Sequence, residues 1–70
     1  MSRKITEWLF VYSIEGRDGR VTFDNSRVEI DSNRTPNIND IRDFEESTAK
    51  KLDAKFVVVV NFKKLGSKFV

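Results

Sequence analysis

The run FVVVVNF, residues 56–62, places the tightest limit on how this chain of 70 residues can fold. Successive side chains of a β-strand point to opposite faces of the sheet, so four consecutive valines put apolar side chains on both faces. Both faces of this strand therefore need to be buried. The single helix-forming segment in the chain can cover one face of a small sheet, and something else has to cover the other face.

A second limit is the small size of the chain, which contains no cysteine and no histidine. A chain this short buries only about 60% of its unfolded surface and is stable by only a few kcal/mol. Without cysteine it can form neither a disulfide framework nor a thiolate zinc site. We therefore expect a single domain over residues 1–70 that gains stability from tight packing or from oligomerisation.

Two segments in the first half of the chain are typical of antiparallel strands. Residues 6–15, TEWLFVYSIE, are rich in aromatic and β-branched types, and residues 20–31 alternate between apolar and polar types. The loop GRDG at residues 16–19 supplies two glycines, which tolerate the positive φ that hairpin connections need. These features predict a β-hairpin.

The second of these strands changes its apolar parity partway along. Val21 and Phe23 have odd numbers, whereas Val28 and Ile30 have even numbers. Because side chains alternate with a period of two, we expect a bulge or a break near residues 24–26.

A helix is predicted from Pro36 or Ile38 to Leu52. Proline disfavours helix immediately before it, and either Thr35 with Pro36 or Asn37 with Asp40 could begin the helix. Its predicted apolar stripe consists of Ile38, Ile41, Phe44, Thr48 and Leu52.

The third strand is predicted over residues 55–65, with a short tail after it. The element order is thus ββαβ, and the simplest sheet has the strand order 2-1-3, with the doubly apolar first strand at the centre. The sequence therefore predicts an α+β fold: a three-stranded sheet with one helix packed on one face.

The pattern also assigns side chains to the two faces of this sheet. On the helix side we place Trp8, Phe10, Ile14, Phe56, Val58, Val60 and Phe62. The predicted partner-binding and dimer-binding residues, at the open side and along the third strand, are Leu9, Val11, Val57, Val59 and Asn61.

Three occupants could cover these open-side residues. An apolar edge strand without proline or a mid-strand charge invites another strand to pair with it. Two copies could then join edge to edge or face to face, or a different protein could add a strand. The alternative is that the tail, residues 65–70, folds back over this surface.

Enzymatic chemistry is not expected from this chain. The absence of histidine and cysteine removes the commonest general base and the thiol nucleophile, and no phosphate-binding or nucleophile motif occurs. The helical carboxylates, Asp40, Asp43, Glu45 and Glu46, are typical of a solvated helix face. We expect no metal, no cofactor and no small-molecule substrate.

Five cations are predicted to converge at one end of the sheet: Arg3, Lys4, Lys63, Lys64 and Lys68. Residues 1–5 and 63–70 contain no acid, so this basic patch could bind nucleic-acid phosphate or an acidic protein. The alternative is that these charges keep an aggregation-prone strand soluble. Similarly, Trp8, Phe10 and Tyr12 could stack on bases, or they could form the core beneath the helix.

The functional hypothesis is a small, non-enzymatic protein-protein interaction module that works as a homodimer and binds, and possibly inhibits, a macromolecular partner. The analogy is with small inhibitors from phages and mobile elements that act against host defence, and it rests on size and composition alone. The alternative is a nucleic-acid-binding protein that uses the basic patch. No signal peptide or membrane-spanning stretch follows Met1, so we expect a complete, cytoplasmic protein.

Overall fold

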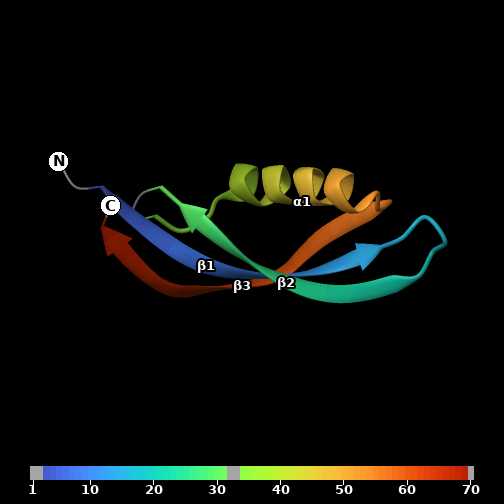
Figure 1. Cartoon of the computed structure of the whole chain (residues 1–70), viewed down its shortest axis with the longest axis horizontal. Helices are drawn as coiled ribbons and strands as arrows, with labels where there is room; N and C mark the ends of the chain where they lie inside the picture. Colours follow the sequence, from blue (N-terminus) through green and yellow to red (C-terminus); the bar gives the residue numbers. More distant parts are fainter. Residues whose placement is uncertain (1–2, 32–33, 70) are drawn as a thin grey trace.

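The computed structural model describes residues 3–31 and 34–69. Its elements, in chain order, are β1 (Lys4–Glu15), β2 (Val21–Ile30), α1 (Ile38–Leu52) and β3 (Phe56–Phe69). The strands form one antiparallel sheet in the order β2-β1-β3, and α1 lies on one face of it (Figure 1). The predicted α+β class, ββαβ element order and 2-1-3 strand order are confirmed.

The hairpin between β1 and β2 is regular, so the bulge predicted near residues 24–26 is wrong. Each residue from Thr6 to Glu15 pairs in constant register with β2, from Ile30 back to Val21. The parity change has a simpler origin: Val28 and Ile30 face the helix, whereas Val21 and Phe23 are exposed on the opposite face.

The loop at residues 16–19 closes the predicted hairpin, and of its two glycines only Gly19 has a positive φ. The N–H of Gly16 donates to the carbonyl of Arg20 at 2.9 Å, and the N–H of Gly19 donates to the carbonyl of Gly16 at 3.0 Å. Gly19 has a φ of 83°, in the left-handed region that glycine adopts without steric cost.

Irregular pairing occurs in the ladder between β1 and β3 instead. Its register shifts twice, which leaves Val60 and Leu65 of β3 as the extra residues. Val57, Val59 and Phe62 consequently share the helix side of the sheet, and Val57 is only 6% exposed.

The predicted face assignment of β3 is therefore wrong at five positions. Phe56, Val58 and Val60, expected beneath the helix, are at least half exposed, whereas Val57 and Val59, expected on the open side, pack in or against the core. Four identical valines carry no parity signal. The extra residue at Val60 then places Phe62 on the same face as Val57, which is the helix side. Phe62 is thus the one aromatic of this run whose face was predicted correctly.

The tail does not fold back over the sheet. Strand β3 continues to Phe69, which pairs with Lys4, and Ser67 pairs with Thr6. This pairing satisfies the backbone groups at the start of β1, which would otherwise lack partners on that side. Val70 lies outside the described residues.

The start of α1 matches the second predicted alternative. Asn37 is the N-cap, and its side chain accepts the N–H of Asp40 at 3.0 Å while the Asp40 carboxylate accepts the N–H of Asn37 at 2.9 Å. Arg34 also donates two hydrogen bonds to the Asp40 carboxylate. These bonds from Arg34 and Asn37 lower the pKa of Asp40 to about 2.

Asp40 should make the fold sensitive to acid in a defined range. Because the folded pKa is depressed, the stabilisation by the carboxylate is complete above the unfolded pKa of about 3.9 and is lost as the pH falls toward 2. We expect Asp40→Asn to lower the melting temperature at pH 7 and to show a smaller further loss between pH 4 and pH 2. Circular dichroism melts at these pH values, with Asp43→Asn as the control on the same helix, measure both effects. An unchanged acid profile in Asp40→Asn would contradict this role.

The helix packs over β3 and the centre of the sheet rather than over all three strands. Ile41, Phe44 and Ala49 contact the core, as the period of the stripe predicts for the first two. Ile38 and Leu52, at the two ends of the predicted stripe, are exposed. The predicted stripe is therefore too long, because α1 contacts the core through Ile41, Phe44 and Ala49 and not through its first and last residues.

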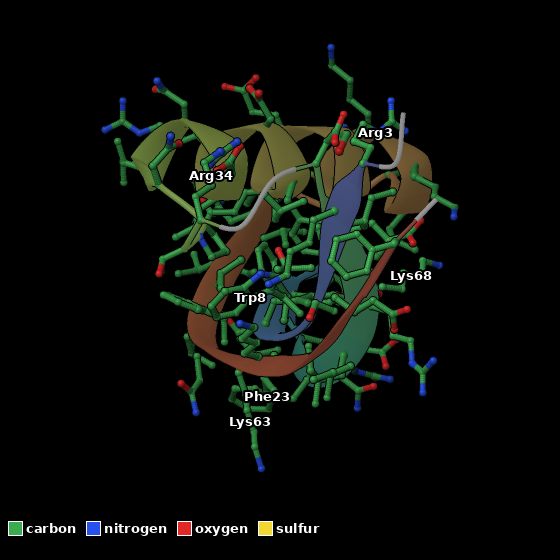
Figure 2. The ribbon with its side chains drawn as sticks, turned by 90° about the vertical axis from the view of Figure 1, so that its left-hand side faces the viewer. Arg3, Trp8, Phe23, Arg34, Lys63 and Lys68 are labelled. Carbon is green, nitrogen blue, oxygen red and sulfur yellow. The ribbon has the colours of Figure 1, made fainter. Side chains whose placement is uncertain are left out.

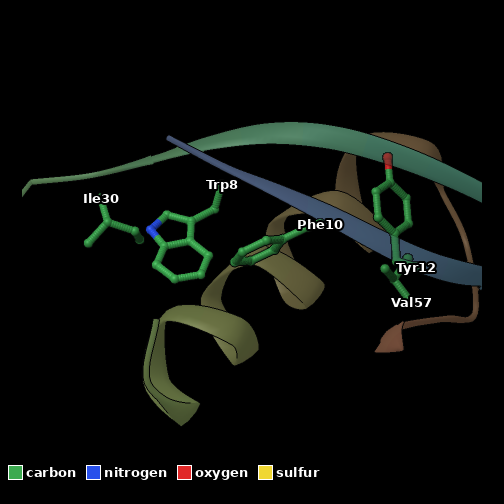
Figure 3. Packing of buried hydrophobic residues seen from close by; sticks show 5 residues of the cluster. All are labelled: Trp8, Phe10, Tyr12, Ile30 and Val57. Atoms are coloured by element: carbon green, nitrogen blue, oxygen red, sulfur yellow. The ribbon is translucent and has the colours of Figure 1, made fainter. Parts of the chain in front are cut away.

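The core lies between α1 and β1 (Figure 3). Its buried members are Trp8, Phe10, Tyr12, Ile30 and Val57. Phe10 is fully buried, and its ring lies 5.0 Å from the ring of Phe44 in an edge-to-face arrangement. Trp8, Phe10 and Tyr12 therefore form the core and are not available for stacking on bases.

The molecule is long and narrow, 48 × 18 × 17 Å. Its radius of gyration is 13.4 Å, whereas a compact domain of this length has about 11 Å. The long strands account for the difference, because twelve residues of β-strand extend about 40 Å. A sheet of this length, covered by one helix on one side, leaves the whole opposite face uncovered (Figure 1).

Candidate protein-interaction surface

The face of the sheet opposite α1, here called the open face, is built from five rows of three residues. In each row a residue of β1 stands between its partners in β2 and β3, and paired residues share a face. From the hairpin end, the rows are Val21, Glu15 and Phe56; Phe23, Ser13 and Val58; Asn25, Val11 and Asn61; Arg27, Leu9 and Lys63; and Glu29, Glu7 and Gly66.

In the two rows nearest the hairpin, exposed apolar side chains of β2 and β3 flank Glu15 and Ser13 of β1. Phe23 is 69% exposed, Phe56 is 56% exposed, and Val21 and Val58 are each about half exposed. Phe23 points away from the helix, on the same side as Lys63 (Figure 2). We call these four residues the apolar patch, and patches of this kind on a small soluble protein mark interaction sites.

The open face becomes polar toward the chain termini. Val11 stands between Asn25 and Asn61 in the middle row, and Leu9 stands between Arg27 and Lys63 in the next. Glu7 and Glu29 follow, and Lys68 reaches both carboxylates at 3.5 Å and 2.7 Å. The open face is thus apolar at the hairpin end and charged toward the chain termini.

Three of the five predicted partner-binding residues lie on the open face: Leu9, Val11 and Asn61. The other two, Val57 and Val59, lie on the helix side, where they contact the core. The four residues of the apolar patch were not among the predicted partner-binding residues. The parity change between Phe23 and Val28 was the available signal, because it reports apolar side chains on the second face of β2.

Both edges of the sheet are blunted by side-chain acceptors. On β3, the Glu45 carboxylate accepts the N–H of Val59 at 2.8 Å, and the Asn61 side chain accepts the N–H of Phe62 at 2.9 Å. On β2, Asp24 accepts the N–H of Asn25 at 2.8 Å. Together with the two bulges in β3, these bonds occupy groups that an added strand would need. The face is therefore a better contact surface than either edge.

The five predicted cations do not form one unpaired cluster. Arg3 lies 3.1 Å from Asp31, and Lys68 is held between Glu29 and Glu7. The hydrogen bond and charge of Glu29 raise the pKa of Lys68. The terminal segments that carry these cations contain no acid, and the acids come instead from β1, β2 and the residue after β2. Only the folded sheet brings them to the cations.

The remaining cations point in different directions. Lys63 pairs with Leu9 on the open face, whereas Lys64 pairs with Trp8 on the helix side. Lys4 pairs with Phe69 at the end of the sheet. The structure therefore divides the predicted basic patch between two faces, which weakens it as a continuous site for phosphates.

A groove of about 420 Å³ lies between α1 and β2 on the helix side. It arises because α1 packs over β3 and leaves β2 without a helix above it. The hydroxyls of Tyr12 and Ser26, 2.9 Å apart, are hydrogen-bonded to each other in its wall. The other lining residues are Asp24, Arg27, Phe44, Thr48, Lys51 and Leu52.

Neither a metal site nor a membrane-spanning helix is found in the part of the chain that the structure describes. Residues 3–31 and 34–69 contain no group of three acidic side chains placed to hold an ion. The helix in these residues is neither long nor apolar enough to cross a bilayer. Comparisons with protein-family models, curated proteins and solved structures gave no match, so the function is inferred from the residues of this chain.

Proposed function

We propose that this chain is a non-enzymatic protein-protein interaction module that binds its partner through the open face. The observation that carries this proposal is the apolar patch, where Phe23, Phe56, Val21 and Val58 are exposed together on an uncovered sheet. Burying such side chains gives about 25 cal/mol per Å² of apolar surface removed from water. A protein surface with apolar side chains of its own supplies that burial.

A protein partner suits this face better than a nucleic acid does. Nucleic-acid binding requires several unpaired cations along one surface, and binding of single strands adds exposed rings beside them. On the open face, Arg27 is 3.8 Å from Glu7, and Lys68 is paired with Glu29. The exposed ring of Phe56 has a cation beside it, since Lys55 Nζ lies 5.6 Å from its centroid, but that lysine also lies 3.6 Å from Glu15.

By occupying a partner's surface, a module of this size would block whatever else binds there. The proposed mode of action is therefore steric inhibition or recruitment, with the apolar patch as the anchor and the charged rows setting the orientation. No catalytic step, metal or cofactor enters this proposal.

The double substitution Phe23→Lys with Val58→Lys tests this function. Tagged chains are incubated with lysate of the source organism, and the amount of each captured protein is measured. We expect the double variant to capture at least tenfold less, because two charges would be desolvated at the anchor. The matched control places the same charges on the exposed face of α1, as Asn39→Lys with Ser47→Lys, and should retain capture. Circular dichroism of both variants checks that each is folded.

Two results would contradict the proposal. Retention of every captured protein by the Phe23→Lys, Val58→Lys variant would exclude the apolar patch as the anchor. Loss of the captured set from wild type on nuclease treatment would instead show that nucleic acid carries the binding. A steep fall of affinity with salt would accompany that second result.

A further inference from the structure

We propose that a second copy of this chain covers the open face, with the two sheets face to face and a two-fold axis parallel to β1. This inference rests on the proposed function of the open face and adds the identity of one partner. The second copy and any other partner would compete for the apolar patch, so self-association would shield the patch until that partner is present.

The sheet register is what selects this axis. A two-fold axis along the central strand places each β2 residue opposite the residue of the same row in β3 of the second copy. Phe23 would then face Val58, and Val21 would face Phe56, in both halves of the contact. Aligned sheets in β-sandwiches pack in this way, about 10 Å apart, with strand directions within about 30°.

The polar rows also match under this axis. Asn25 would face Asn61, so that two side-chain amides could exchange hydrogen bonds, and Val11 would face its own copy. A two-fold axis across the strands fits less well. Centred on the middle row, it places Phe23 opposite Arg27 and Val58 opposite Lys63. Centred between the first two rows, it places Phe23 opposite Val21 and Val58 opposite Phe56, but it leaves the other three rows outside the contact. The parallel axis therefore places apolar side chains opposite apolar ones at the β2 and β3 positions of the first two rows, and Asn25 opposite Asn61 in the third.

Three rows oppose this dimer, because like charges would face each other in them. Arg27 would face Lys63 of the second copy, and Glu7 and Glu15 of β1 would each face their own copy. Within each chain, Glu7 lies 3.8 Å from Arg27 and Lys55 lies 3.6 Å from Glu15, which offsets part of the repulsion. Salt screens exposed charges but strengthens the burial of apolar surface, so association should become tighter as salt increases.

The size of the contact predicts a weak dimer. A stable interface buries about 20–30 residues on each side, whereas the open face offers five rows of three. The strands also bend around the helix side, which makes the open face convex and shortens the length over which two copies can touch (Figure 1). We therefore expect a dissociation constant in the range of about 1 to 100 μM.

Isotope-filtered nuclear Overhauser spectra of a mixture of labelled and unlabelled chains, at about ten times the dissociation constant, test the arrangement directly. We expect intermolecular contacts between the ring of Phe23 and the methyl groups of Val58, and between the Val11 side chains. Sedimentation of the same protein should show a reversible dimer that becomes tighter with salt. Phe23→Lys should weaken it at least tenfold, whereas Asn39→Lys should leave it unchanged.

Each other outcome overturns the inference in an identifiable way. Contacts from Phe23 to Arg27, without contacts to Val58, would establish the axis across the strands. Contacts among β3 backbone amides would establish edge pairing. A monomer at millimolar concentration would exclude the second copy. If the chain is a monomer but capture of another protein still depends on Phe23 and Val58, only the second copy is excluded and the proposed function stands. If capture does not depend on these two residues either, the proposed function fails as well.

Discussion

Phe10→Ala should unfold this protein or leave it marginally folded at room temperature. Phe10 has no exposed surface, and its ring lies against Phe44 at 5.0 Å and near Phe62 at 6.1 Å. Removing a buried phenylalanine ring costs about 3–5 kcal/mol through lost burial and the cavity left behind. A domain of this size is stable by only a few kcal/mol, so this loss approaches the whole free energy of unfolding.

Urea unfolding followed by the fluorescence of Trp8, the one tryptophan in the chain, measures this effect. Trp8 is buried, so its emission should move to longer wavelength on unfolding. Phe69→Ala, which removes the same ring from a site that is 71% exposed, should change the free energy of unfolding by less than about 0.5 kcal/mol. Equal losses in the two variants would contradict the burial pattern of β1.

Thr6→Val should destabilise the protein although it keeps the size and shape of the side chain. Thr6 is 1% exposed, and its hydroxyl oxygen accepts the indole N–H of Trp8 at 3.1 Å. The hydroxyl also lies 3.4 Å from the carbonyl oxygen of Ile30, to which it donates. Valine leaves the buried indole N–H without this acceptor, which costs about 1–3 kcal/mol.

Thr6→Ser separates the hydrogen bond from the packing. Serine keeps the hydroxyl and removes one methyl group, worth about 0.8 kcal/mol. We therefore expect Thr6→Val to unfold at a lower urea concentration than Thr6→Ser, with a shift in Trp8 emission in the folded state. A Thr6→Val protein as stable as wild type would show that the indole N–H finds another acceptor.

The elements of the fold were predictable because each has a local cause. β1 has aromatic and β-branched side chains, the hairpin has Gly19 at a position with positive φ, and α1 begins at the capping box of Asn37 and Asp40. None of these features depends on residues that are distant in the sequence. The core was predictable on β1 for the same reason, since Trp8, Phe10 and Tyr12 alternate with less buried neighbours.

The candidate site was only partly predictable. Leu9 and Val11 were placed correctly, because alternation on β1 leaves them no other face. Phe23 was not predicted at the site, because a change of parity within a strand also indicates a bulge, and β2 has none. The contact of Glu45 with the backbone of Val59 could not be predicted, because it depends on where α1 lies over β3.

By itself, then, the sequence determined the four elements, their order and the inward face of β1, because local patterns and the short connections leave few alternatives. The tertiary structure alone decided which valines of β3 are buried, because a bulge at Val60 changes the alternation and four identical residues give no sign of it. It also brought Glu29 beside Lys68, across a strand that separates them in the sheet. Pairing between distant strands thus left the protein with an apolar open face and divided its predicted basic patch.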